Sequence, residues 1–204
     1  MSSGFGSGTG PESPSEVSVS ILHWVMSALV VFTLVVGVID ARTGHIPNRL
    51  LLVGLVAGVG LHASTYFVLR AGQPLAQTLT ASFLSVLAGL LLCAAVPLLL
   101  FRLNAMGGGD VKLLAVIGAS MGPFVGMEIE LYAFVLLALF APARLAYQGQ
   151  LLRSLGNSAA LLLNPILPKA RQREIPRELL TALPFGPAVF VAALLVAFLH
   201  WRQA

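Results

Sequence analysis

The sequence predicts an all-α, polytopic integral membrane protein with about six transmembrane helices. The chain has 204 residues, of which 57% are hydrophobic and only 10% are charged, whereas soluble globular proteins have roughly 25% charged residues. Its mean hydropathy is +0.91. Several apolar runs follow one another, each of about 20 residues, the length that a helix needs to cross a bilayer. These observations argue against a soluble domain carried on a single anchor.

The start of the chain predicts a tail and one helix. Residues 1–17 are rich in Gly, Ser and Pro, a composition that cannot bury a core, so we expect a disordered tail. The first span is expected over 18–39 and stops at Asp40, before a polar connection over 41–46. No Lys or Arg precedes Arg42, and the first run therefore lacks the basic region of a signal peptide and predicts an uncleaved span.

Breaker residues divide the remaining apolar sequence into five more spans. Pro47 begins the second helix, because its fixed φ and missing N–H are tolerated at a helix start. The fourth helix is expected to end around Gly122-Pro123, within a span placed at about 110–127. The predicted spans are 48–69, 79–101, 110–127, 129–147 and 183–200. A cytoplasmic loop is expected over 148–182, and residues 18–204 form a single membrane-embedded domain.

The basic residues divide unequally between the two sides of this arrangement. Ten lie on the side of the first, third and fifth connections: Arg42, Arg49, Arg102, Lys112, Arg144, Arg153, Lys169, Arg171, Arg173 and Arg177. Only Arg70 and Arg202 lie on the other side. Since basic residues favour the cytoplasmic side, both termini are predicted to face outward. The net charge of +4 is therefore interpreted as a topology signal rather than a nucleic-acid interface.

Two acidic residues lie where apolar runs begin or end. Asp40 closes the first run, and Asp110 follows Gly107, Gly108 and Gly109 at the start of the fourth. The other six lie in the tail or in predicted loops: Glu12, Glu16, Glu128, Glu130, Glu174 and Glu178. An ionisable residue at the edge of a membrane helix is costly and is interpreted by default as functional. Because two spans separate the aspartates, both are expected at the cytoplasmic face.

Two carboxyl groups that meet in a partly dry site share one proton. The ionised member can take a proton from water while the protonated member polarises a carbonyl group, as in aspartic proteases. Glycines without Cβ atoms let a substrate backbone approach closely. We therefore hypothesise that Asp40 and Asp110 are catalytic and that Gly107, Gly108 and Gly109 support them.

Structural readings of the same residues remain open. Asp40 alone is also explained by a pair with neighbouring Arg42, and Asp110 alone by capping of the fourth helix. The glycines are also explained by close helix packing. Lys112 is interpreted as a snorkelling anchor, with a role in holding the charge of the aspartates as the alternative.

No metal or cofactor is expected. His23, His45, His62 and His200 show no ligand spacing for a metal. Cys93 is the only cysteine and lies in an apolar run, so it forms no disulfide framework and is expected to pack as a small hydrophobic residue.

Three blocks resemble the type IV prepilin peptidase family. Residues 107–113, Gly-Gly-Gly-Asp-Val-Lys-Leu, resemble its Gly-X-Gly-Asp signature, in which the Asp is one catalytic residue. Residues 40–48 resemble its other block, an Asp followed by a short basic connection and Ile-Pro-Asn, here ending in Pro47 and Asn48. Residues 183–188, Leu-Pro-Phe-Gly-Pro-Ala, are similar to the Pro-Phe-Gly-Pro segment that opens its last helix.

The resemblance implies a membrane-embedded aspartic endopeptidase that removes the short basic leader from prepilin-like precursors at the cytoplasmic face of the inner membrane. Asp40 and Asp110 would be catalytic, and Lys112, Pro47 and Asn48 would support the site. The short form looks most like the stand-alone peptidases of tight-adherence (Tad, Flp-type) pilus systems. Larger members carry an insert with paired Cys-X-X-Cys motifs and also methylate the new terminus. This chain has one cysteine, so no zinc is expected and methylation is not predicted.

Other functions fit parts of the pattern. Archaeal preflagellin peptidases are comparably compact. Intramembrane proteases related to presenilin share the Gly-X-Gly-Asp motif but couple it to Tyr-Asp, whereas Ile39 precedes Asp40 here. A small proton- or cation-coupled transporter subunit would place its acids nearer mid-membrane, and a structural scaffold would tolerate loss of both aspartates. The sequence leaves the precursor and the oligomeric state open.

Overall fold

A computed structural model describes residues 14–103, 105–147 and 184–203, and every regular element in these ranges is a helix. The helices are α1 Pro14–Thr43, α2 Asn48–Leu69, α3 Leu75–Arg102, α4 Gly108–Met121, α5 Pro123–Tyr147 and α7 Gly186–Gln203. The all-α class is thereby confirmed. Residues 1–13 of the predicted tail over 1–17, and the predicted loop over 148–182, lie outside the described residues.

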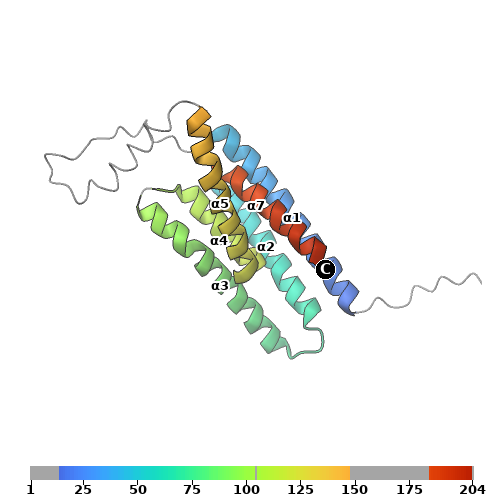
Figure 1. Cartoon of the computed structure of the whole chain (residues 1–204). Coiled ribbons are helices and arrows are strands. Elements are labelled where there is room, and N and C mark those ends of the chain that lie inside the picture. The colour runs from blue at the N-terminus through green and yellow to red at the C-terminus, as the bar shows by residue number, and fades with distance from the viewer. Residues whose placement is uncertain (1–13, 104, 148–183, 204) are drawn as a thin grey trace, which may run out of the picture.

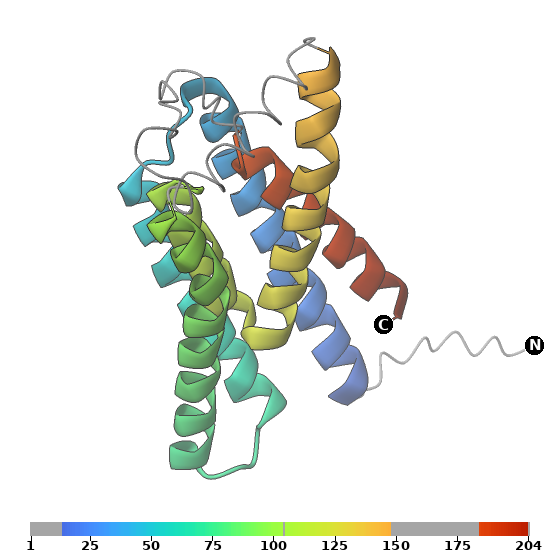
Figure 2. The same ribbon diagram turned by 60° about the vertical axis from the view of Figure 1, so that its left-hand side comes forward.

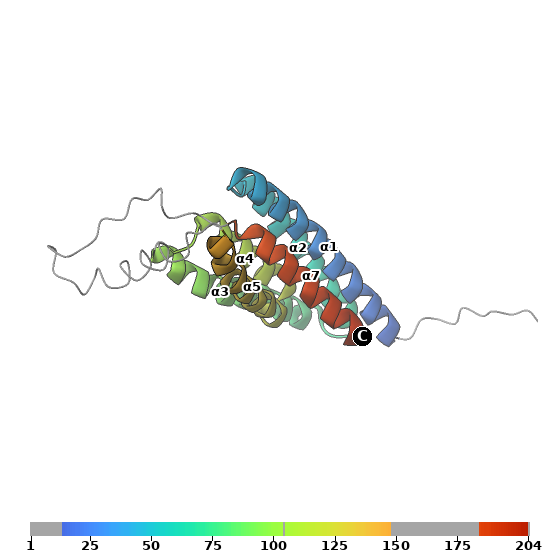
Figure 3. The same cartoon turned by 45° about the horizontal axis from the view of Figure 1, so that its top comes forward.

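The helices form one bundle in which segments distant in sequence lie side by side. α7 packs along α1, and α4 packs against α2 and α3 (Figures 1 and 3). α5 contacts α3, α4 and α7 and so connects the two groups. Asp40 belongs to the first group and Asp110 to the second.

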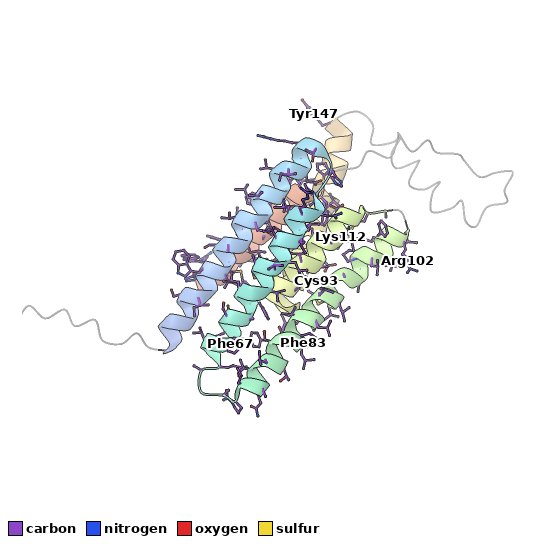
Figure 4. The ribbon with its side chains drawn as sticks, turned by 180° about the vertical axis from the view of Figure 1, so that it is seen from behind. Phe67, Phe83, Cys93, Arg102, Lys112 and Tyr147 are labelled. Atoms are coloured by element: carbon purple, nitrogen blue, oxygen red, sulfur yellow. The ribbon has the colours of Figure 1, made fainter. Side chains whose placement is uncertain are left out.

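The bundle has two distinct ends. The C-terminal end of α1 and the N-terminal ends of α4 and α7 lie together, which we call the site end, and the α2–α3 turn lies opposite, at the far end (Figure 2). Figure 4 shows Arg102, Lys112 and Tyr147 towards the site end and Phe67 and Phe83 towards the far end. The parity argument, which requires Asp40 and Asp110 at the same end, therefore holds.

Among the residues that the structure describes, four helical segments are long and apolar enough to cross a membrane: His23–Thr43, Asn48–Leu69, Leu75–Arg102 and Pro123–Phe140. Their outward faces carry large exposed apolar side chains, among them Leu52, Phe83 and Phe124, as expected for a surface in contact with lipid. α4 has 14 residues and a length of about 21 Å, less than the roughly 30 Å of a hydrocarbon core. α7 is also a shorter apolar helix. The structure thus supports a polytopic membrane protein with four full-length candidate spans.

The predicted boundary between the fourth and fifth spans is wrong. Residues 123–127 belong to α5 rather than to the end of the preceding helix. Gly122 ends α4 with a φ of 78°, a conformation that is available to glycine because it has no Cβ. Pro123 then opens α5, where it lacks only an N–H that would have no helical partner. The chain therefore turns back without a separate loop.

Two acids that were assigned to predicted loops lie within α5, Glu128 and Glu130. The changed boundary places Glu128 in the helix, whereas Glu130 was already the second residue of the predicted span 129–147. Glu130 is only 6% exposed and contacts the Cys93 side chain, which is itself buried. The statement that every acid other than the two aspartates lies in a tail or loop is therefore wrong.

Other helix ends shift by smaller amounts. α1 starts at Pro14, so the last four residues of the predicted tail, Glu16 among them, are helical. α1 also continues past Asp40 to Thr43. Gly44 ends it with a φ of 62° and donates its N–H to the Asp40 carbonyl at 2.8 Å, a common C-terminal cap. Asp40 consequently lies in the last turn of the helix rather than after it.

The remaining boundaries are close to the prediction. α2 covers 48–69 as expected, although Pro47 is its N-cap and not its first residue. α3 starts at Leu75 instead of 79. α7 starts at Gly186 instead of 183 and ends at Gln203 instead of 200.

α4 lies at the centre of the bundle. Leu113, Leu114 and Ile117 are fully buried. Gly118 of α4 meets Gly89 of α3 so closely that a Cβ on either would overlap the backbone of the other. In lipid, such packing of small residues rather than a hydrophobic effect holds helices together. The helix that carries Asp110 is therefore fixed on several sides.

Candidate active site

Asp40 is buried in the interface between α1 and α7. It is 5% exposed, and its Oδ2 accepts a hydrogen bond from the Gly186 backbone N–H at 2.8 Å. A carboxyl group taken out of water is costly unless it is hydrogen-bonded, and a bond to a carboxylate is stronger than one between neutral groups. The first residue of α7 thus holds the side chain of Asp40.

This contact requires a very close approach of α1 and α7. A Cβ on Gly186 would lie 2.9 Å from the Asp40 Cβ and 3.0 Å from its Oδ2. A Cβ on Gly37, one turn earlier in α1, would lie 3.2 Å from the Gly186 carbonyl oxygen. Neighbouring Phe185 is buried and its ring centroid lies 5.6 Å from that of Phe134 in α5. The segment opening α7 is therefore anchored on both sides.

Asp110 is the third residue of α4 and is partly buried. Its carboxyl group is hydrogen-bonded to the backbone of Gly107, the N-cap of the helix. A side chain at this position that reaches back to the N-cap N–H is one half of a capping box. The alternative that Asp110 helps to cap α4 is consistent with this contact.

The two carboxyl groups approach one another. Asp40 and Asp110 lie close enough for their charges to repel. Gly109 packs against Ile46, since a Cβ on it would lie 3.4 Å from the Ile46 Cβ, and Ile46 is buried. The connection after α1 thus packs against the glycine run. The N-termini of α4 and α7 both lie beside the two aspartates. Such termini favour negative charge.

The other predicted support residues lie farther from the pair. Gly108 faces the Phe101 ring. Lys112 is exposed and donates to the Asn48 side chain at 2.9 Å, which ties α4 to α2. Two residues along a helix correspond to about 200°, so Lys112 lies on the face opposite Asp110. Lys112 and Asn48 also border a mainly apolar groove of about 400 Å³ between α2, α3 and α4.

The arrangement can perform acid–base chemistry without a metal. Neighbouring carboxyl groups share a proton, and a carboxylate beside a protonated carboxyl can activate water. Within the described residues, no group of three or more His, Cys, Asp or Glu side chains could hold a metal ion.

Two residues were missed by sequence reasoning. Gly186 was noted only within the block 183–188, with no role, although parity places the start of the last helix at the same face as Asp40. Glu130 was counted among the loop acids although it is the second residue of the predicted span 129–147, and its position in an apolar run was the signal for a buried acid.

The family model of the type IV leader peptidase family matches residues 27–142, more than half of the chain. The matched region includes Asp40, the glycine run and Asp110, and it ends before the segment that opens α7. No curated protein and no solved structure gives a significant match.

Proposed function

The chain belongs to the type IV leader peptidase family, and from this premise we propose that it is a membrane-embedded aspartic endopeptidase with Asp40 and Asp110 as its catalytic pair. Its proposed substrate is a prepilin-like precursor whose short basic leader it removes. The observation that carries the proposal is the approach of Asp40 and Asp110 from α1 and α4. Membership of a peptidase family by itself assigns the reaction class but not these residues.

The proposed reaction uses both members of the pair. The ionised carboxyl takes a proton from water, and the resulting oxygen attacks the carbonyl carbon of the scissile bond. The protonated carboxyl polarises the carbonyl oxygen. The glycine run offers backbone without side chains beside Asp110, where an extended substrate segment can lie.

The proposed location is the cytoplasmic face of an inner membrane. The ten-to-two distribution of basic residues favours this face for the site end, with both termini outside and about six crossings, the shorter α4 and α7 included. A precursor with a basic leader and an apolar helix would place its scissile bond at the membrane boundary, beside Asp40 and Asp110. The partners are then this precursor and the bilayer, with no nucleic acid.

Two alternative functions are each favoured by a different observation. A preflagellin peptidase or another Gly-X-Gly-Asp intramembrane protease would use the same aspartates on a different substrate. A proton- or cation-coupled transporter subunit gains one supporting observation, because Glu130 is a buried acid inside a helix. Glu130 also contacts Cys93, and this contact is enough to explain its burial by a structural role.

Co-expression with candidate precursors tests the proposal. The host should lack other prepilin peptidases, and precursor and mature bands should be compared for the wild type, Asp40→Asn and Asp110→Asn. Only the wild type should shorten the precursor. Glu128→Gln is a matched control, because it makes the same carboxyl-to-amide change at a partly buried acid that hydrogen-bonds to His200 away from the aspartates.

The result that overturns the assignment is cleavage by either Asn variant present in the membrane at the wild-type level. If the wild type cuts no precursor, the transporter alternative is tested by proton flux into vesicles, and Glu130→Gln should then abolish the flux. Cleavage should also follow a bell-shaped pH profile, because one carboxyl must be ionised while the other is protonated. A flat profile through the carboxyl range contradicts the pair.

A further inference from the structure

We propose that Gly186 is a positioning residue of the peptidase. Its backbone N–H holds the Asp40 carboxyl group in one orientation, and in the proposed division of roles Asp40 takes the proton from water while Asp110 carries the shared proton. This inference rests on the proposed function and adds to it a division of roles within the pair. It assigns a role to the segment 183–188, which the function itself leaves without one.

A short hydrogen bond connects Gly186 to Asp40. The Gly186 N–H lies 2.8 Å from Asp40 Oδ2, and a donor fixed in a helix orients the carboxyl group that accepts from it. Asp40 is nine-tenths buried, so water can replace this donor less easily than at the partly buried Asp110. The following residue is Pro187, which has no N–H, and Gly186 is therefore the donor that the start of α7 directs at Asp40.

The donor to Asp40 comes from a different helix, whereas the donor to Asp110 comes from its own turn. Asp110 bonds within its own turn, to Gly107 three residues earlier, as an acid at that helix position commonly does. Gly186 is far from Asp40 in sequence and reaches it only because glycines on both helices allow the approach. A donor on a packed helix fixes the orientation of the Asp40 carboxyl group. The bond of Asp110 to its own glycine-rich turn fixes the Asp110 carboxyl group less firmly.

The division of roles gives a balanced reaction. Water transfers a proton to the Asp40 carboxylate, its oxygen bonds to the carbonyl carbon, and the Asp110 proton moves to the carbonyl oxygen. The resulting gem-diol collapses as the C–N bond breaks. Protonated Asp40 then gives its proton to the leaving nitrogen, and a diol hydroxyl returns a proton to Asp110. Both carboxyls end in their starting states, and no other reactant is needed.

The test removes the Gly186 N–H without adding a side chain, and its control covers the weaker acceptor that an ester makes of the Phe185 carbonyl. Cell-free translation into nanodiscs can incorporate glycolic acid at position 186, which replaces the amide N–H by an ester oxygen without adding a side chain. The matched control is the corresponding ester at Val189, whose N–H donates to the Phe185 carbonyl at 3.1 Å in the same turn and does not contact Asp40. Cleavage of one purified precursor is measured for both and for the wild type.

The 186 ester should lower kcat about tenfold to a hundredfold, the effect of losing a hydrogen bond to a charged group, with KM unchanged. The 189 ester should stay within about threefold of wild type, since it loses an ordinary helix bond. Equal kcat values for the two esters overturn the positioning role while leaving the peptidase intact. A wild type that cleaves no precursor overturns both the function and this inference.

A side-chain variant covers the case in which the 186 ester does not fold. Gly186→Ala places a methyl group against the Asp40 carboxyl, whereas Gly37→Ala crowds the same helix contact through the Gly186 carbonyl. Gly186→Ala should lower kcat at least about tenfold more than Gly37→Ala does, again without a change in KM. Equal effects of the two methyl groups, or a loss confined to KM, overturn the proposal.

Discussion

The site end and the far end of the bundle both contain buried polar groups, but they satisfy them differently. At the far end, His62 of α2 lies between two partners: Nδ1 is 3.0 Å from the Ser120 carbonyl oxygen and Nε2 is 3.2 Å from the Ser85 hydroxyl. A carbonyl oxygen only accepts, so Nδ1 carries the proton and Nε2 accepts from Ser85. Both ring nitrogens are therefore used, and three helices are joined.

The hydrogen bonds around His62 satisfy a carbonyl group at the C-terminal end of the short helix α4. Ser120 belongs to the last turn of α4, whose carbonyl groups have no partner within the helix. α4 ends at Met121, short of the length needed to cross a bilayer, and open backbone at membrane depth is tolerated only where protein covers it. His62 supplies the missing donor, so this polar cluster is explained by structure alone.

The site end differs in chemistry. Its buried polar groups are carboxyls, which accept at about four sites each when ionised, and the Gly186 N–H fills one such site on Asp40. The two carboxyls also repel one another. A cluster of neutral groups whose hydrogen bonds are all satisfied is explained by structure, whereas two acids held together at a cost in free energy indicate function.

The largest effect is expected from Asp110→Asn. Cleavage should fall by at least about a hundredfold, the contribution of a positioned acid or base, while the thermal midpoint stays at or above the wild-type value, because an amide avoids the cost of keeping a second ionisable carboxyl group partly buried beside Asp40. Purified protein in nanodiscs is assayed for cleavage and for thermal unfolding. A lower midpoint together with retained cleavage would make Asp110 a structural cap and would erase the contrast between the two ends.

His62→Leu should give the opposite pattern. It leaves the Ser120 carbonyl without its donor and removes the bond to Ser85, which together cost about 2–4 kcal/mol. Cleavage per folded molecule should stay within about threefold of wild type. Chemical or thermal unfolding measures the first effect and a cleavage assay at low temperature the second. A stable variant that has lost cleavage would connect the far end to the chemistry.

Gly58→Ala sharpens the structural reading of the far end. The added methyl group would overlap the Ser120 side chain, and overpacking of this kind costs about 1–3 kcal/mol. The double variant Gly58→Ala with Ser120→Gly should recover most of that stability. Gly60→Ala is the control, because no atom lies within 4 Å of its added Cβ. If Gly58→Ala and Gly60→Ala unfold at the same temperature, α2 and α4 are not tightly packed at Gly58.

The smallest effect is expected from the bond between Lys112 and Asn48. Lys112→Gln and Asn48→Ala each remove one exposed hydrogen bond, so each should change stability by less than about 1 kcal/mol, and the double variant should add little. Cleavage should change less than about threefold. A tenfold loss of cleavage in Lys112→Gln alone would show that Lys112 helps to hold the charge of the aspartates despite facing away from Asp110.

Local sequence patterns are sufficient to predict the helical class, the span over 48–69 and the placement of Asp40 and Asp110 at the same end. These follow from the length of apolar runs, from the backbone limits of Pro and Gly, and from counting crossings, all of which act locally or by parity. The same local rules put the end of the fourth span at 127, because apolar residues continue on both sides of Gly122 and their pattern does not change there.

Contacts between distant segments lie beyond local rules. At the turn, His62 and Ser85 from two other helices lie beside Gly122. The burial of Glu130 likewise depends on the helices that pack against α5. The hold of Gly186 on Asp40 exists because Gly37 and Gly186 let α1 and α7 pack closely, and such an approach depends on which faces meet in three dimensions rather than on any single segment.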